Sequence, residues 1–111
     1  MQKWKCTICG YIHDGDAPPD KCPRCGAPKD KFEKIPDDKS KLIDRSRLSN
    51  GLHKKLFTLL EEIEHIGSKG VEDNLDPGCV AIFTRAKDEA HLLRKFIRAE
   101  IEAHVSKGKW G

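Results

Sequence analysis

The sequence contains no apolar run long enough to cross a bilayer, because charged residues make up 35% of its 111 positions. Its first residues, MQKWKC, lack the pattern of a signal peptide. It also lacks a strong excess of either charge, since 21 lysines and arginines oppose 18 aspartates and glutamates. A net charge of +3 is small for a protein that neutralises nucleic-acid phosphates. We therefore expect a cytoplasmic protein that binds neither membranes nor nucleic acids.

The chain is also too short to bury a large core, because 111 residues make one ordinary domain or two very small ones. Its composition changes near residue 40. Cysteines cluster before that point, and apolar residues at helical spacing follow it. The polar stretch 36–41, which begins with Pro36, is typical of a boundary between modules. We therefore expect two modules, at residues 1–36 and 42–108.

The first module contains two Cys-x-x-Cys pairs, Cys6 with Cys9 and Cys22 with Cys25. Two such thiolates can bind one ion from a single tight turn, and a second turn of the same kind completes a tetrahedron of sulfurs. A glycine follows each pair, where a positive φ lets backbone N–H groups face the sulfurs. A module of this size buries too little apolar surface to be stable without a cross-link, and metal binding can supply the missing folding free energy. We predict that these four cysteines are metal ligands.

The cysteine spacing leaves the identity of the metal open, because a cage of four thiolates suits iron and zinc alike. His13 lies between the two pairs, but with four thiolates present we expect it at the surface. The fifth cysteine, Cys79, follows more than fifty residues after the others. We expect it to be a small buried side chain near the start of a helix.

The residues around the cysteines resemble a known family. They read Trp4-x-Cys6-x-x-Cys9-Gly10-Tyr11-x-His13-x-Gly15, then Ala17-Pro18, Cys22-Pro23-x-Cys25, Pro28 and Phe32-Glu33. This pattern is similar to the short rubredoxin-type domain found in rubrerythrins. The twelve residues between the two pairs also match that short form, and not the longer loop of free-standing rubredoxins. The resemblance covers the first third of the chain, and the helical remainder resembles no family that we recognise.

The resemblance implies that Cys6, Cys9, Cys22 and Cys25 hold one iron ion that cycles between its ferric and ferrous states. The implied fold is a small β module with two cysteine knuckles, in which residues 1–5 pair with residues 31–35 and Trp4 and Phe32 pack beneath the metal. The implied function is transfer of single electrons to a partner oxidoreductase. No catalytic residues are evident, so an electron carrier is favoured over an enzyme.

Two other functions stay open. A structural zinc ribbon that binds a protein partner would use the same cysteines, and zinc can also substitute for iron in such a cage. A rubrerythrin-like peroxide reductase or ferroxidase would need a di-iron site in the helices. Candidate ligands for a second metal are Glu62, His65, Glu89, Glu100 and His104. The second helix lacks a Glu-x-x-His motif to match Glu62 and His65, which disfavours the enzyme.

Apolar residues take a helical period after residue 42. The first stripe steps by four and three residues and comprises Leu52, Leu56, Leu59, Ile63 and Ile66. Asn50 and Gly51 interrupt the pattern and mark either a kink or the true start of the helix, in which case residues 42–48 form a short preceding turn. We expect Gly67 and Gly70 to end this helix. Asp76 and Pro77 give a start signal for a second helix at residues 77–107, ending at Gly108. Its stripe includes Ala86, Leu93, Ile97 and Ile101.

Two helices joined by a short loop fold into an antiparallel hairpin, in which we expect the two stripes to pack together. Further apolar residues lie beside or beyond the stripes, namely Leu48, Phe57, Leu60, Phe83 and Phe96. A lone hairpin cannot cover all of them, so we expect a homodimer or a higher homo-oligomer in which hairpins pair as four-helix bundles. Such pairing would also bring Glu100 and His104 near hydrogen-bonding groups of the other chain.

Overall fold

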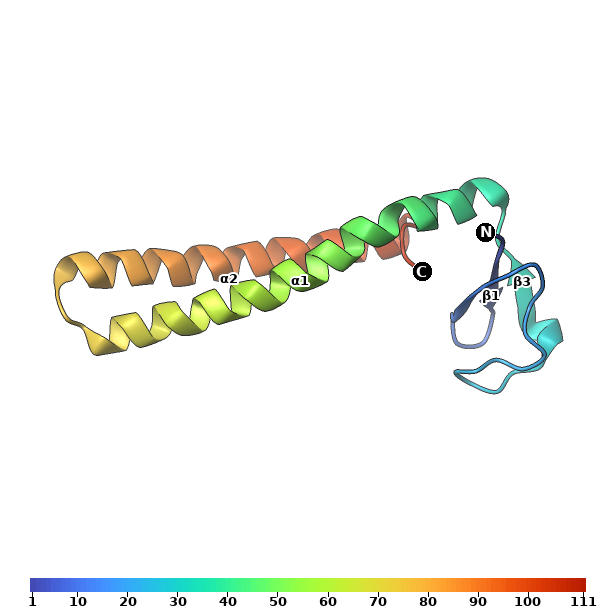
Figure 1. The fold of residues 1–111 in the computed structure, drawn as a ribbon, viewed down its shortest axis with the longest axis horizontal. Coiled ribbons are helices and arrows are strands. Elements are labelled where there is room, and N and C mark those ends of the chain that lie inside the picture. Colours follow the sequence, from blue (N-terminus) through green and yellow to red (C-terminus); the bar gives the residue numbers. More distant parts are fainter. The chain divides into compact units, whose positions relative to one another are not determined.

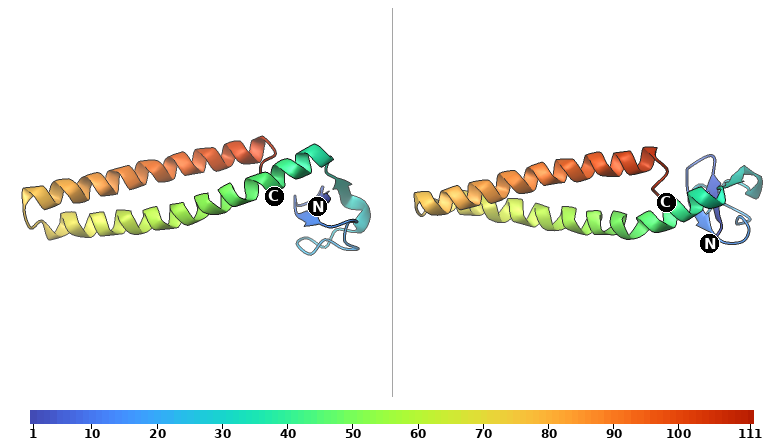
Figure 2. Two further views of the ribbon diagram at one scale, coloured as in Figure 1. Left: turned by 45° about the horizontal axis from the view of Figure 1, so that its top comes forward. Right: turned by 90° about the horizontal axis from the view of Figure 1, so that it is seen from above.

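The computed structural model describes residues 1–111 and divides into two compact units. One unit comprises residues 1–47 with residues 107–111, and the other comprises residues 48–106. Along the chain, three short strands precede two long helices, and the division between the units falls inside the first helix (Figures 1 and 2). No helix combines the length and the apolar character that crossing a membrane requires.

The first unit contains a three-stranded antiparallel sheet with the order β2-β1-β3. Strand β1 spans Lys3–Cys6, β2 spans Ile12–Asp14 and β3 spans Phe32–Lys34, which follows a short 3-10 helix, η1, at Lys29–Lys31. In the register of the sheet, Trp4 lies opposite His13 on one side and Lys34 on the other. The predicted pairing of the N-terminal strand with residues 31–35 is confirmed.

The core of this sheet module is small and includes two of the cysteines. Cys6, Cys22, Ala27 and Phe32 are buried, and Trp4, Cys9 and Tyr11 pack against them. The indole Nε1 of Trp4 donates a hydrogen bond to the Gly15 carbonyl at 3.1 Å. The indole is thereby fixed at both its apolar body and its polar edge. The predicted packing of Trp4 and Phe32 with the cysteines is confirmed.

Helix α1 spans Asp37–Asp73, which is longer than expected. The polar stretch at the expected module boundary forms its first turn, and the separate turn expected at residues 42–48 is part of the same helix. Pro36 directly precedes the helix, and its carbonyl accepts a hydrogen bond from the Ser40 N–H at 2.8 Å. Asp37 and Asp38 favour a helix start here, because carboxylates stabilise the positive end of the helix dipole.

The prediction that Gly67 and Gly70 end this helix is wrong. A Cβ atom on Gly67 would lie 2.7 Å from the Phe83 carbonyl oxygen, and one on Gly70 would overlap the Phe83 ring. The absence of side chains at these two glycines therefore allows the second helix to pack closely against the first. The helix ends at Asp73, and Asn74, which follows, has a left-handed φ of 50°.

Helix α2 spans Pro77–Ser106, close to its predicted bounds. The Asp76 carboxylate caps it by accepting a hydrogen bond from the Cys79 N–H at 2.7 Å. Gly108 follows the helix with a φ of 72°. Within the unit of residues 48–106, α1 and α2 run antiparallel and side by side in every view of Figures 1 and 2. The predicted hairpin is confirmed.

The hairpin packs through a different stripe of α1 from the one we expected. Leu60, Ala90 and Ile97 are buried together, with Phe57 and Ile101 against them. In contrast, the whole predicted stripe of α1 is exposed, with Leu52 at 56% and Leu59 at 54%. Hydrophobic periodicity reveals an apolar face but does not say which neighbour covers it. The inward side of α1 also contains polar residues, which made it less conspicuous in the sequence.

Three polar contacts pair the polar residues in the seam between the helices. His104 Nδ1 lies 2.5 Å from the Asn50 side-chain oxygen, and both residues are buried. Glu64 on α1 accepts a hydrogen bond from Arg94 on α2 and contacts His91 Nδ1 at 2.7 Å. Buried polar groups cost little stability when they are paired in this way.

Candidate metal centre

Each Cys-x-x-Cys pair lies in a tight turn, and the same turn occurs twice. In the first turn, the Cys6 N–H donates to the Tyr11 carbonyl at 2.8 Å and the Gly10 N–H donates to the Cys6 carbonyl at 2.9 Å. The second turn repeats both hydrogen bonds, at 2.8 and 2.9 Å, between the corresponding residues. Gly10 and Gly26 have φ angles of 82° and 78°, which side chains with a Cβ rarely adopt. The glycine after each pair is therefore required by the turn.

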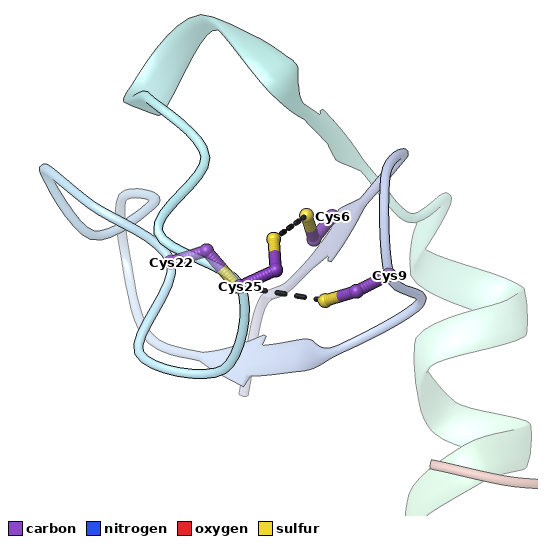
Figure 3. A group of neighbouring side chains, drawn as sticks. All are labelled: Cys6, Cys9, Cys22 and Cys25. Carbon is purple, nitrogen blue, oxygen red and sulfur yellow. Dashed lines mark hydrogen bonds between the residues drawn. The ribbon is translucent and has the colours of Figure 1, made fainter.

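The two turns bring the four predicted cysteines together (Figure 3). Cys6 Sγ lies 3.7 Å from Cys25 Sγ, and Cys9 Sγ lies 3.6 Å from Cys22 Sγ. All four sulfurs lie within 4.8 Å of one another. A tetrahedral ion with metal–sulfur bonds of about 2.3 Å separates its sulfurs by about 3.8 Å. The four cysteines fit this geometry and could hold one metal ion.

Backbone N–H groups stabilise negative charge on the second sulfur of each pair. A hydrogen bond from the Tyr11 backbone lowers the pKa of Cys9 to about 6. The Ala27 backbone acts in the same direction on Cys25, but burial and the neighbouring sulfurs raise the pKa of Cys25 to about 12. Four adjacent thiolates repel one another, so complete ionisation requires a cation among them. Metal binding at this cluster would therefore release protons.

One edge of the sulfur cluster faces solvent. Cys6 and Cys22 are buried, Cys9 is half-buried and Cys25 is exposed. Ile8, between the first two cysteines, is 64% exposed. The centre is therefore shielded by the sheet module on one side and accessible to another molecule on the other.

The remaining candidate ligands do not form a second group of converging ligand atoms within the chain. Glu62 and His65 are exposed on α1, and exposed Glu89 on α2 pairs with Arg85 at 2.9 Å. Glu100 lies 3.1 Å from His104 Nε2. His104 also contacts Asn50, so both Glu100 and His104 have contacts within the chain.

Cys79 lies outside the sulfur cluster, as the third residue of α2. It is half-buried near the helix start, so its predicted position is confirmed although its burial is partial. The Asp76 carboxylate beside it, together with burial, raises the pKa of the Cys79 thiol. This thiol is therefore poorly suited to act as a nucleophile at neutral pH.

Sequence reasoning missed an ion-pair network that supports the sheet module. Arg47 on α1 reaches Asp14 on β2 with two hydrogen bonds of 2.7 and 3.0 Å. These bonds, and the contact with Lys3, hold the pKa of Asp14 well below its usual range. Arg47 also donates to the Gly111 carbonyl at 2.8 Å. No local signal in the sequence connects residues so far apart.

Comparison with known proteins identifies relatives of the sheet module. Residues 4–33 match the family described as "Rubrerythrin, rubredoxin-like domain". Reverse rubrerythrin-1 of Clostridium acetobutylicum is 41% identical over 59 residues, which cover 51% of this chain and 33% of that protein. Rubrerythrin of Nitratidesulfovibrio vulgaris is 52% identical over 31 residues, covering 28% of this chain and 16% of that protein. This chain thus spans only a third or less of the length of either relative.

Free-standing rubredoxins are matched over their full length. Rubredoxin-2 of Chlorobaculum tepidum is 44% identical over 52 residues, covering 32% of this chain and 100% of that protein. No solved structure matches the chain. The stretch shared with reverse rubrerythrin-1 is longer than residues 4–33, so that likeness extends into neighbouring residues. Since a whole rubredoxin is covered and the rubrerythrin-type domain is matched, the chain belongs to the rubredoxin family through its N-terminal module.

Proposed function

We propose that the four cysteines bind one iron ion and that the protein is an electron carrier for a partner oxidoreductase. The observation that carries this proposal is the convergence of the four sulfurs at the spacing of a tetrahedral ion. The relatives named rubredoxin and reverse rubrerythrin support iron as the metal. A bound iron would supply a one-electron couple between its ferric and ferrous states.

The residues around the sulfurs have distinct roles in this proposal. The backbone N–H groups of Tyr11 and Ala27 disperse negative charge on Cys9 and Cys25, which favours the more negative, reduced centre. Trp4 and Phe32 pack against the cluster and limit its hydration. The exposed edge at Cys25 leaves a short path for an electron to a docked protein.

The proposal assigns different tasks to the two parts of the chain. Residues 1–36 form the redox module, and residues 42–108 form the helical module that makes a homodimer or a higher homo-oligomer. The partner is a redox protein, and the carrier works in the cytoplasm. Binding of nucleic acid or membrane has no part in this function.

A structural zinc site is the second candidate, because the sulfur spacing fits zinc as well as iron. A zinc-bound module would hold the same two turns together and do no redox chemistry. The two candidates differ in colour, since ferric thiolate centres absorb visible light and zinc centres do not.

A redox cycle tests the proposed function. In anaerobically purified protein, dithionite should bleach a visible band and air should restore it. Cys9→Ala should abolish the band, and Cys79→Ala should preserve it, because Cys79 lies outside the sulfur cluster. A correctly folded protein that stays colourless in both states would overturn the assignment.

A further inference from the structure

One side of the helical hairpin is apolar and uncovered within the chain. We call it the apolar face, and it comprises Leu48, Leu52, Leu56, Leu59, Ile63 and Ile66 of α1 with Ile82, Leu93 and Phe96 of α2. Each of these side chains is at least 40% exposed. All of them belong to the unit of residues 48–106.

The α1 and α2 parts of this face point to the same side of the hairpin. At about 100° per residue, the stripe of α1 lies roughly 110° around the helix from its inward residues, such as Leu60. The α2 residues of the apolar face, Ile82, Leu93 and Phe96, lie roughly 100° from the inward residues of α2, such as Ala90, in the same rotational sense along the chain. The exposed apolar residues of each helix are thus displaced from its inward side by a similar angle and in the same sense along the chain. Because the two helices run antiparallel, this displacement places the apolar residues of both helices on the same side of the hairpin. The opposite side is polar and includes Thr58, Glu61, Lys95, Arg98 and Glu102.

The size of the apolar face calls for a protein partner. Its nine side chains expose on the order of 900 Å², compared with about 300–600 Å² for the largest patch on a typical monomer. That area is close to the roughly 800 Å² that each partner buries in a standard interface. A groove of about 380 Å³ also lies along α1, lined by Leu52, Leu56 and Leu59 among others.

We propose that a second copy of this chain covers the apolar face, so that two hairpins stack into a four-helix bundle. The stripe on α1 steps by four and three residues, which is the spacing of helices that pack along their length. The face extends over two helices, and a second hairpin, which is also two helices wide, can cover it. A two-fold axis between the copies places the same surface of each chain in contact. This inference rests on the oligomer proposed above and identifies its partner and its surface.

Two carboxylates lie within the α2 part of the apolar face and have partners in the chain. At about 100° per residue, Glu89 and Glu100 fall in the same arc as the apolar residues of α2. Glu89 pairs with Arg85 at 2.9 Å, and Glu100 contacts His104 at 3.1 Å. Both carboxylates already have partners within the chain, so a second copy would strand neither charge.

The test measures the mass of the full chain by sedimentation velocity at about 50 µM. We expect wild-type protein at twice the chain mass of 12.5 kDa, or at a multiple of that dimer. Leu59→Lys and Ile63→Lys should each weaken association at least tenfold, because each places a charge in the interface. Thr58→Lys, on the polar side next to Leu59, should leave the mass unchanged. Helicity is recorded for every variant, and half-exposed Leu59 and Ile63 should tolerate lysine without loss of the hairpin.

Two results would overturn the proposal. One is a helical wild-type monomer at this concentration. The other is an oligomer that stays intact with both Leu59→Lys and Ile63→Lys, whatever the effect of Thr58→Lys. Metal content and the visible spectrum are recorded on the same samples. A dimer without iron would refute the proposed electron carrier alone, whereas a monomer with an intact iron band would refute the interface alone.

Discussion

The buried ammonium group of Lys3 lies 2.7 Å from the carboxylate of Asp44. Lys3 opens strand β1, and Asp44 lies near the start of α1 within the same compact unit. The Lys3 side chain is 0% exposed, and its Nζ also contacts Asp14 at 2.9 Å. The strand that ends at Cys6 is therefore joined by ion pairs to the helix that follows the sheet.

We expect Lys3→Met to destabilise the sheet module by about 2–3 kcal/mol, which is less than a fully buried pair would cost. The substitution keeps much of the buried stem but leaves two partly exposed carboxylates with fewer cations. Denaturant unfolding followed by tryptophan emission measures the change, since Trp4 and Trp110 both lie in this unit. Lys5→Met, at an exposed position on the same strand, should change stability by less than about 0.5 kcal/mol. Equal effects of the two substitutions would contradict a structural role for Lys3.

Gly67 and Gly51 should respond in opposite ways to alanine. Alanine usually favours an exposed helix by up to about 1 kcal/mol over glycine, and nothing lies within 4 Å of a Cβ on Gly51. A Cβ on Gly67 would instead lie 2.7 Å from a carbonyl oxygen of α2. We expect Gly51→Ala to stabilise the hairpin and Gly67→Ala to destabilise it by about 1–3 kcal/mol. Thermal unfolding followed at 222 nm would show this, and stabilisation by Gly67→Ala would refute the close approach of the helices.

The hairpin should lose stability in acid through Glu64. Burial acts to raise the pKa of Glu64, but hydrogen bonds from His91 and Arg94 hold it below its usual value. A carboxylate with a lowered folded-state pKa contributes stability above its unfolded-state pKa, about 4.3, and loses it as pH falls through the folded-state pKa. The free energy of unfolding should therefore fall as the pH drops below about 5 and through the lowered folded-state pKa of Glu64.

Glu64→Gln should weaken this pH dependence, and Glu62→Gln, on an exposed residue of the same turn, should retain it. Urea titrations of helicity across the pH range measure both slopes. If the two variants kept the same slope as the wild type, the contacts of Glu64 with His91 and Arg94 would contribute nothing to stability.

The sheet module could be predicted from sequence because its determinants are local. Cys6 and Cys25 lie nineteen residues apart, and each pair of cysteines is arranged by one turn with its own glycine. The contact between Lys3 and Asp44 could not be predicted in this way. It depends on the direction in which α1 leaves the sheet, and no pattern in the sequence records that direction.

The helices could be predicted as elements but not as a packed pair. The stripe from Leu52 to Ile66 is more apolar than the true seam, which includes Asn50 and Glu64. Those two residues are tolerated because residues of α2 pair with them, and this pairing appears only in the fold. A glycine such as Gly67 has the same local sequence context whether it ends a helix or allows a neighbouring helix to pack closely.

The central claim is that the four cysteines hold one iron ion that carries an electron. Its most direct test is the ratio of metal to chain, measured together with the visible spectrum, in protein purified anaerobically from its native host. The account predicts one iron per chain and a ferric thiolate band that disappears on reduction. Zinc alone in a folded, colourless protein would contradict it, and so would a ratio near two irons per chain, which would indicate a second metal site.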